Sequence, residues 1–351
     1  MLPSISWPHP ALDPSTHLIP SIRTYLPSLI SHFTSHPWSQ LSSWKSYYQQ
    51  SDSFHVAITF CSFVSFYVWL MERITGNASQ VDGLWTFLPV IYSLHFTFHD
   101  YLSSSSSLFQ TVTVWNKVQP RLALMSALSI LWSIRLTYNA IRRGMFKPGE
   151  EDYRWPILRK KIPSWFAWQL FSLFFIAIAQ NILLAITALP QYLLLTTTFS
   201  KRSKAHVVPK PIDSLTWDDY VLAAVFVFNL SLQYLADHQQ WTYQNYKRGL
   251  DPNEKPLASV DPVTRLPTQP QQVTPYSKPE DAKRGFVTRG LWSWSRHPNF
   301  ACEQSTWWIL FAFVPLTLSP SSSQDQWYKY LFNFATLSPL AMNALFLAST
   351  S

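Results

Sequence analysis

The residues best suited to polar chemistry are concentrated in one stretch, GLWSWSRHPNFACEQSTWW, at residues 290–308. It carries a hydroxyl, a guanidinium, an imidazole, an amide and a carboxylate, on Ser295, Arg296, His297, Asn299 and Glu303. Such groups can bind an anion or move a proton. A strongly apolar run follows directly, so this chemistry lies at the start of an expected membrane helix.

Asp237 lies in a second polar stretch, LQYLADHQQWTYQNYKR, at residues 232–248. On a helix, Gln233 and Asp237 share one face because they are four residues apart, and Gln240 and Gln244 continue near it. A charge inside a membrane usually faces a partner or a wet cavity, because its burial in lipid is costly. The alternative is that Asp237 only marks the point where the helix leaves the membrane, and spacing alone leaves both interpretations open.

The sequence argues against the usual phosphate-binding loops and against a metal site. Its seven glycines do not have the spacing of a GxGxxG turn or a GxxxxGK[ST] loop. If a nucleotide binds, side chains must hold its phosphates, and arginine is the residue best suited to that task. We expect no metal, because His297 has no HxxxH or HExxH partner and His95 with His99 is an isolated pair.

The elements that must position these residues are long apolar segments. Charged residues make up 13% of the 351 residues, against about 25% in average soluble proteins. Seven apolar blocks are long enough to consider as spans: 54–71, 83–101, 122–141, 165–198, 220–235, 306–318 and 328–347. We therefore predict an all-α, polytopic membrane bundle of about seven transmembrane helices.

Three details of this prediction depend on single blocks. Pro190 is the expected break in the long fourth block. The fifth and sixth blocks are short for a full span, so buried or re-entrant helices are the alternative there. The third block carries Arg135, which should face a partner or a wet cavity.

The connecting segments suggest domain limits and an orientation. Residues 1–50 form a Pro/Ser-rich N-terminal segment that lies at a membrane surface or is partly disordered, 51–351 form the transmembrane domain, and 251–281 form a disordered cytoplasmic insertion. The loops after the third and fifth blocks are richer in Lys and Arg than the loop after the fourth, which predicts a lumenal N-terminus and a cytoplasmic C-terminus. Those loops explain the net charge of +8 without a nucleic acid.

The start of the chain, MLPSISWPHP, lacks the features of a signal peptide, so the first internal span is expected to direct insertion. The two cysteines, Cys61 and Cys302, cannot form a disulfide framework. The endoplasmic reticulum is the expected membrane.

The long RHPN stretch resembles the signature of the membrane-bound steroid 5α-reductase-like superfamily, and in particular its DUF1295 branch. The matching residues are Gly290, Leu291, Trp292, Ser295, Arg296, His297, Pro298, Asn299, Glu303, Trp307 and Trp308. Three further stretches agree in order: DGLW at 82–85, LWSIRL with EDYRW within 131–155, and ADHQQWTY at 236–243. The resemblance covers about residues 54–348.

The resemblance implies an integral membrane oxidoreductase that uses NADPH to reduce a carbon–carbon double bond conjugated to a carbonyl, in a lipophilic, sterol- or lipid-like substrate. It implies a set of cofactor-binding residues: Arg296, His297, Asn299 and Asp237, with Ser295, Glu303 and Arg289. The catalytic acid is not identified by the motif. Candidates near the first two blocks are Tyr92, His95 and Glu72.

This chain departs from the family pattern at several places. Phe300 stands where Tyr is common, Ala301 and Cys302 replace Phe-Gly, and Gln233 stands where a carboxylate or Asn is common. The chain stops at Ser351, where relatives usually continue with a Tyr-rich tail. Two alternatives stay open. Membrane methyltransferases that use S-adenosylmethionine share the RHP core, and the departures from the pattern favour a non-catalytic relative.

Overall fold

The structure is a computed structural model that describes residues 7–104, 118–202, 214–250, 276, 279–319 and 327–350. Within these ranges the chain forms helices and no strands, so the all-α prediction is confirmed. The chain divides into two compact units. One consists of Met1–Ala223 with Trp307–Ser351, and the other of Ala224–Thr306.

The described α-helices, in chain order, are α1 (Leu18–Ser35), α2 (Leu41–Gln50), α3 (Ser53–Thr75), α4 (Leu88–Ser104), α6 (Pro120–Arg142), α7 (Arg154–Lys161), α8 (Trp165–Phe171), α9 (Gln180–Ile186), α10 (Leu189–Arg202), α11 (Trp217–Lys247), α12 (Pro279–Arg284), α13 (Pro298–Leu318) and α14 (Leu337–Thr350). The short turns are η1 (Pro10–Leu12), η2 (Ala78–Gln80), η3 (Asp82–Leu84), η7 (Gly290–Ser293), η8 (Trp327–Tyr330) and η9 (Phe334–Thr336), and the π-helical segment η5 covers Ser172–Ala179.

Three helical segments are long and apolar enough to cross a membrane: α3, the continuous run Trp165–Ile186, and α11. A shorter apolar helix covers Phe334–Leu347. These findings support an integral, multi-pass membrane protein and confirm the seven-span prediction in part. The remaining predicted blocks form the helices α4, α6 and α13.

The limits of α3 follow from local chemistry. The Asp52 side chain accepts a hydrogen bond from the Phe54 backbone N–H at 2.8 Å, which satisfies a donor at the first turn. Gly76 ends the helix in the left-handed conformation, with φ of 69°. At 1.5 Å per residue, these 23 residues span about 34 Å, enough for the hydrocarbon core.

Two predicted blocks have different limits in the structure. The fifth block was expected to be short, but α11 runs for 31 residues because its helix continues through the polar stretch after Leu235. The fourth block breaks at Thr187 and Ala188, just before α10, and not at Pro190. Pro190 lies in the first turn of α10, where its missing N–H would have no partner in any case.

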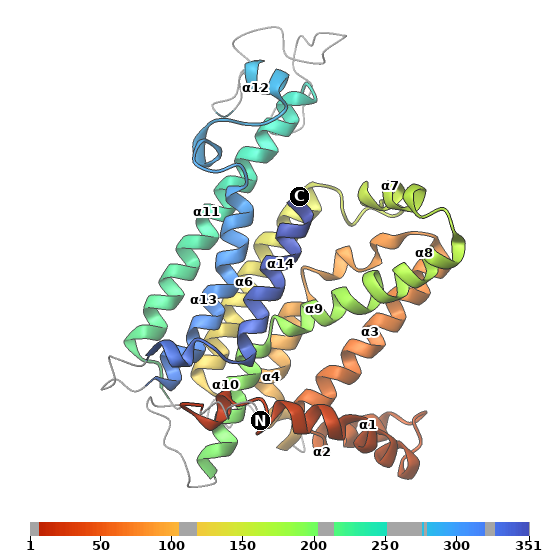
Figure 1. The fold of residues 1–351 in the computed structure, drawn as a ribbon, viewed down its shortest axis with the longest axis vertical. Helices are drawn as coiled ribbons and strands as arrows, with labels where there is room; N and C mark the ends of the chain where they lie inside the picture. The colour runs from red at the N-terminus through yellow and green to blue at the C-terminus, as the bar shows by residue number, and fades with distance from the viewer. Residues whose placement is uncertain are drawn as a thin grey trace, which may run out of the picture. The chain divides into compact units, whose positions relative to one another are not determined.

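The N-terminal segment contains the helices α1 and α2, which pack at the beginning of α3 (Figure 1). The His55 ring bonds to the backbone carbonyl of Ser21 at 2.8 Å, and the hydroxyls of Tyr47 and Thr59 are 2.9 Å apart. Most of the expected insertion at 251–281 lies outside the described residues, but its last three residues belong to α12.

The core of the larger unit holds polar contacts as well as apolar side chains. Between α4 and α6, the Ser126 hydroxyl lies 2.8 Å from those of both Ser93 and Thr97. At the start of α6, the buried Arg121 donates through Nε and Nη2 to both carboxylate oxygens of Asp219, at 2.6 and 2.7 Å. Each of these polar groups is therefore paired inside the apolar bundle, as burial requires.

Candidate functional site

The smaller unit contains most of α11 and the first half of α13, and a ladder of polar contacts joins the two helices. The Asn229 side-chain amide donates to the Cys302 carbonyl at 2.8 Å and to the Thr306 hydroxyl at 3.0 Å. One helical turn further along α11, the Gln233 amide donates to the Glu303 carboxylate. Residues further along α11 pair with residues nearer the beginning of α13, so the two helices run antiparallel.

The third rung of the ladder holds the RHPN segment. The Asn299 side-chain Nδ2 donates to Asp237 Oδ1 at 3.2 Å, and its Oδ1 accepts from the Phe300 backbone N–H at 3.1 Å. The Trp292 indole N–H donates to the Ala236 carbonyl at 3.1 Å. Asp237 therefore lies on the buried face of α11 and does more than mark the end of a span.

Gly290 allows the loop to pass close to α11. Its φ is 63°, a conformation that favours glycine. A Cβ atom at this position would lie 2.6 Å from the Gln239 side chain. The Gln239 Oε1 accepts the Leu291 backbone N–H at 2.9 Å, so both residues fix where the loop begins.

Beyond this point, α12 is fastened to the end of α11. The Tyr243 hydroxyl donates to the Asp281 carbonyl at 3.1 Å. The Asp281 carboxylate accepts from the Thr288 hydroxyl at 2.7 Å and from its backbone N–H at 3.1 Å. Asp281 is buried and held on both sides, so it acts as a structural anchor for the loop.

The structure separates the predicted cofactor residues into two groups. Asp237 and Glu303 are buried in the ladder and Asn299 is half-buried there. The others are exposed in the loop before α13: Arg289, Ser295, Arg296 and His297. The ladder therefore fixes the segment, and the residues of the loop before α13 are open to solvent.

Phe300, one of the departures from the family pattern, contacts the loop directly. Its ring stacks on the His297 imidazole, with 5.4 Å between centroids and 26° between planes. The His297 backbone N–H donates to the Ser295 hydroxyl at 3.2 Å. An aromatic ring at position 300 therefore orients the exposed imidazole without offering a hydroxyl of its own.

The buried polar side chains in the last third of α11 were only partly predicted from the sequence. Gln240 was expected near the polar face, but Thr242, Asn245 and Tyr246 were not singled out. Thr242 is 3% exposed, and Asn245 and Tyr246 are fully buried. Among the described residues, the polar atoms of these three side chains and the Gln240 Oε1 have no hydrogen-bond partner. Such buried groups are rare in folded proteins, and a bound ligand or an ordered water is one way in which their bonding is completed.

The three candidate acids belong to the larger unit, and their contacts do not join them. His95 has both ring nitrogens engaged, Nε2 with the Ser53 carbonyl at 2.8 Å and Nδ1 with the Tyr48 hydroxyl at 3.4 Å. Tyr92 is buried on α4 with its ring 5.6 Å from that of Phe60. Of the three, His95 best fits a structural role.

Glu72 lies at the end of α3 beside a second polar network. Its Oε1 accepts from the Arg73 guanidinium at 2.7 Å and from the Trp168 indole at 3.1 Å, while Oε2 is buried with no partner among the described residues. Arg73 also donates to Ser172, at the start of the π-helical segment. A buried carboxylate with one open oxygen can accept a proton or a hydrogen bond.

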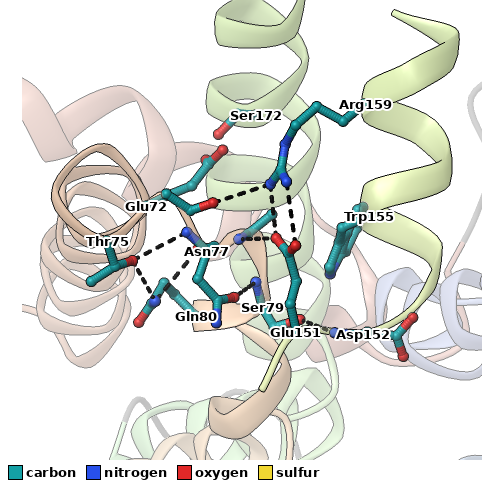
Figure 2. A network of polar contacts seen from close by, with 12 residues as sticks. Glu72, Thr75, Asn77, Ser79, Gln80, Glu151, Asp152, Trp155, Arg159 and Ser172 are labelled. Atoms are coloured by element: carbon teal, nitrogen blue, oxygen red, sulfur yellow. Dashed lines mark hydrogen bonds and ion pairs between the residues drawn. The ribbon is translucent and has the colours of Figure 1, made fainter. Parts of the chain in front are cut away.

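A neighbouring polar network joins two of the motif stretches, DGLW at 82–85 and EDYRW at 151–155. We call this network, which covers residues 77–82 and 150–159, the clasp. Figure 2 shows Arg159 and Glu151 facing each other, with Nη2 and Oε1 2.8 Å apart. Glu151 Oε1 also accepts the Ala78 backbone N–H at 2.8 Å, and the Trp155 indole donates to Asp82 at 3.0 Å.

Two carboxyl groups of the clasp have shifted pKa values. Burial raises the pKa of Asp82, and hydrogen bonds from Trp155 and Ser79 only partly oppose it. For Asp152, burial acts in the same direction, but hydrogen bonds and the charge of Arg154 outweigh it and lower the pKa. The clasp therefore contains one carboxyl that ionises reluctantly and one that is held as a carboxylate.

Comparison with known proteins gives a family without a described activity. Residues 68–350 match the family described as "Protein of unknown function (DUF1295)". An uncharacterized protein of Schizosaccharomyces pombe is 32% identical over 269 residues, which cover 76% of this chain and 66% of that protein. The chain thus spans just under two thirds of this relative's length. No solved structure matches. Because the match extends over most of the chain, the protein belongs to the DUF1295 family.

Proposed function

We propose that this chain is an integral membrane oxidoreductase that uses NADPH to reduce a carbon–carbon double bond conjugated to a carbonyl in a lipophilic substrate. The observation that carries the proposal is a group of buried polar atoms in the last third of α11 that have no partner among the described residues, at Gln240, Thr242, Asn245 and Tyr246. They follow, along the chain, the part of α11 that holds the RHPN loop. A bound polar molecule would complete this bonding, and a dinucleotide offers hydroxyl, amide and phosphate groups for it.

The residues present fit such a ligand. Arg296 and Arg289 are exposed and suited to phosphate, since a guanidinium binds phosphate through paired N–H groups. The Asn245 amide and the Thr242 hydroxyl can donate to or accept from ribose hydroxyls or a carboxamide. When bound, the reduced nicotinamide supplies the hydride, and the protein contributes orientation and electrostatics.

In this proposal Asp237 and Glu303 are positioning residues. Asp237 accepts a hydrogen bond from the Asn299 side-chain amide, and Glu303 accepts one from the Gln233 side-chain amide. Both carboxylates therefore help to hold α13 against α11. Tyr92 and Glu72 are the remaining candidates for the acid that supplies the second hydrogen as a proton. The substrate class, a lipophilic enone, rests on the family resemblance.

Ligand-dependent stabilisation of the detergent-purified chain tests the proposal. A ligand that binds only the folded state at a hundred times its Kd adds about 2.7 kcal/mol to the free energy of unfolding. NADPH should therefore raise the melting temperature. A rise with S-adenosylmethionine and none with NADPH would support a methyltransferase instead, and no response to either would favour a non-catalytic relative.

Arg296→Ala identifies the site. Loss of a charge-assisted bond to phosphate costs about 1.5–3 kcal/mol, so the Kd for NADPH should rise about 10- to 150-fold. The melting temperature without ligand should stay unchanged, because Arg296 is exposed. Arg143→Ala, a change of an exposed arginine in the other unit, is the matched control and should leave the Kd unaltered. Equal Kd values for the two variants would show that the cofactor site is elsewhere.

A further inference from the structure

The helix α1 presents an apolar stripe that no described residue covers. Ile22, Leu26 and Ile30 are 54–59% exposed, and with Ile19 they follow a spacing of three or four residues. Residues at this spacing lie on one face of a helix. Trp38 and Leu41, which follow α1, are exposed even more, at 74% and 85%.

The opposite face of α1 is fixed to the membrane bundle. The Ser21 carbonyl and the Thr24 hydroxyl both contact the His55 ring, at 2.8 and 3.3 Å. The Tyr25 hydroxyl is 3.2 Å from that of Thr59. A helix that packs on one side and exposes a continuous apolar stripe on another needs an apolar environment for that stripe.

The depth of these contacts indicates which environment it is. His55 and Thr59 lie in the first two turns of α3, within about 9 Å of its beginning at Ser53. Amphipathic helices that lie in a membrane interface insert about 5–10 Å into the boundary between headgroups and acyl chains. If α3 crosses the bilayer, α1 is therefore at the level of the interface.

The exposed surface of this segment continues onto α3. The Trp44 ring of α2 contacts Phe63, which is half exposed on α3, at 5.3 Å between centroids. Phe66 and Leu70 follow on the exposed surface of the same helix. On a membrane-spanning helix this surface faces lipid, so the apolar surface of the N-terminal helices adjoins a lipid-facing one.

The charge pattern indicates what holds α1 there. Between Pro14 and Ser51 the chain has no Asp or Glu, and its basic residues are Arg23 and Lys45. Asp13 and Asp52 flank this segment directly, and its two basic residues add only about 1 kcal/mol each near an anionic surface, so electrostatic attraction is weak. Four apolar side chains contribute more, at about 1.5–3 kcal/mol for each one fully buried.

We propose that α1 lies in the plane of the membrane interface, with Ile19, Ile22, Leu26 and Ile30 inserted among the lipid acyl chains at the end of the bundle where α3 begins. The occupant of the apolar stripe is thus the bilayer, and apolar burial holds the helix there. This inference does not depend on the cofactor proposal.

Site-directed spin labelling of the full chain in lipid nanodiscs tests it. The background carries Cys61→Ala and Cys302→Ser, and single labels are placed by Ile22→Cys, Leu26→Cys or Ser31→Cys. Ser31 is the matched control, because it is an exposed polar residue of the same helix. Accessibility to oxygen, which dissolves in lipid, is compared with accessibility to a water-soluble nickel chelate.

Labels at Ile22 and Leu26 should be severalfold more accessible to oxygen than to the chelate, the Ser31 label should show the reverse, and high salt should not change this pattern. Chelate access at all three positions would overturn the proposal, since α1 would then lie in water. Exclusion of both reagents at Ile22 and Leu26 would also overturn it, because a protein surface would cover the stripe. Phe66→Cys on α3 gives the reference for a lipid-facing site.

Discussion

Thr242→Val should stabilise the ligand-free protein and weaken NADPH binding. Thr242 is buried on α11, and its hydroxyl has no partner among the described residues. Valine has nearly the same shape and a similar helix propensity, so the change removes the hydroxyl and little else. The protein would lose an unsatisfied polar group and, with it, a group that the ligand can bond.

Thr306→Val is the matched control on the facing helix. Thr306 is just as buried, at 1% exposed against 3% for Thr242, but its hydroxyl donates to the Cys302 carbonyl and accepts from the Asn229 amide, both at 3.0 Å. At Thr306, removing the hydroxyl breaks two hydrogen bonds that the protein makes. It should therefore have the opposite effect on stability.

The expected magnitudes follow from the bonding of each hydroxyl. A buried polar group left without a partner costs about 1–3 kcal/mol, so Thr242→Val should raise the free energy of unfolding by about 1 kcal/mol. Thr306→Val should lower it by about 1–2 kcal/mol. The loss of one neutral hydrogen bond to the ligand should raise the Kd for NADPH about threefold to tenfold in Thr242→Val alone.

Thermal unfolding of the purified variants, with and without NADPH, gives both quantities. A lower melting temperature in Thr242→Val, comparable to that of Thr306→Val, would refute the reasoning, because it would mean that the Thr242 hydroxyl is bonded in the protein. A stabilised variant with an unchanged NADPH response would show that these buried polar groups of α11 do not face the ligand.

Further predictions concern the pairs and turns that hold the fold. Arg121→Ala should cost about 3–5 kcal/mol of stability in chemical unfolding, because it leaves the buried Asp219 carboxylate without its cation. The double variant Arg121→Met/Asp219→Leu should recover much of this loss. If Arg121→Ala were as stable as the native chain, the two residues would not form a buried ion pair. Gly290→Ala should lower the melting temperature and weaken NADPH binding, since its φ of 63° costs about 1–2 kcal/mol for other residues and the Gln239 side chain must move; an unchanged melt would show that the loop is not constrained there. Burial raises the pKa of Asp82 above the usual 3.8, so the stability linked to its protonated form is fully present below that pH and is lost as pH rises through the folded-state pKa. Asp82→Asn should therefore unfold at a higher temperature than the native chain at neutral pH, with the difference disappearing below about pH 4; a constant difference across pH would exclude ionisation as the cause.

The sequence predicted which segments are helical better than it predicted where the helices end. The start of α3 was predicted to within one residue of Ser53, but the helix continues four residues beyond the predicted end at Met71, until Gly76 terminates it. The length of α11 was underestimated because the prediction followed mean hydropathy. The polar residues after Leu235 lower the mean, but several of them are buried, and Asp237 and Gln239 bond to the loop and helix that follow much later in the chain. A pattern within one segment cannot reveal such partners.

The contacts of the candidate site depend on an arrangement that the sequence does not reveal. The i, i+4 spacing placed Gln233 and Asp237 on one face, yet their partners Glu303 and Asn299 lie more than 60 residues further along the chain. That pairing depends on the antiparallel register of the two helices. The buried polar group at Thr242 and beyond was missed for a similar reason, since a missing partner is a property of tertiary structure and has no signature in sequence.

The arrangement also separates two roles within the RHPN motif. Both ends of the Asn299 amide are engaged, Nδ2 with Asp237 and Oδ1 with the Phe300 backbone N–H. Asn299 is therefore held in one orientation at the start of α13, with Arg296 and His297 in the exposed loop directly before it. A change at Asp237 should then act on ligand binding through the loop, although its carboxylate accepts the Asn299 amide and need not touch the ligand. The family resemblance alone would assign one role, cofactor binding, to Asp237 and to the RHPN residues. The bonding indicates instead that Asp237 and Asn299 hold the segment, whereas Arg296 and His297 are exposed to solvent.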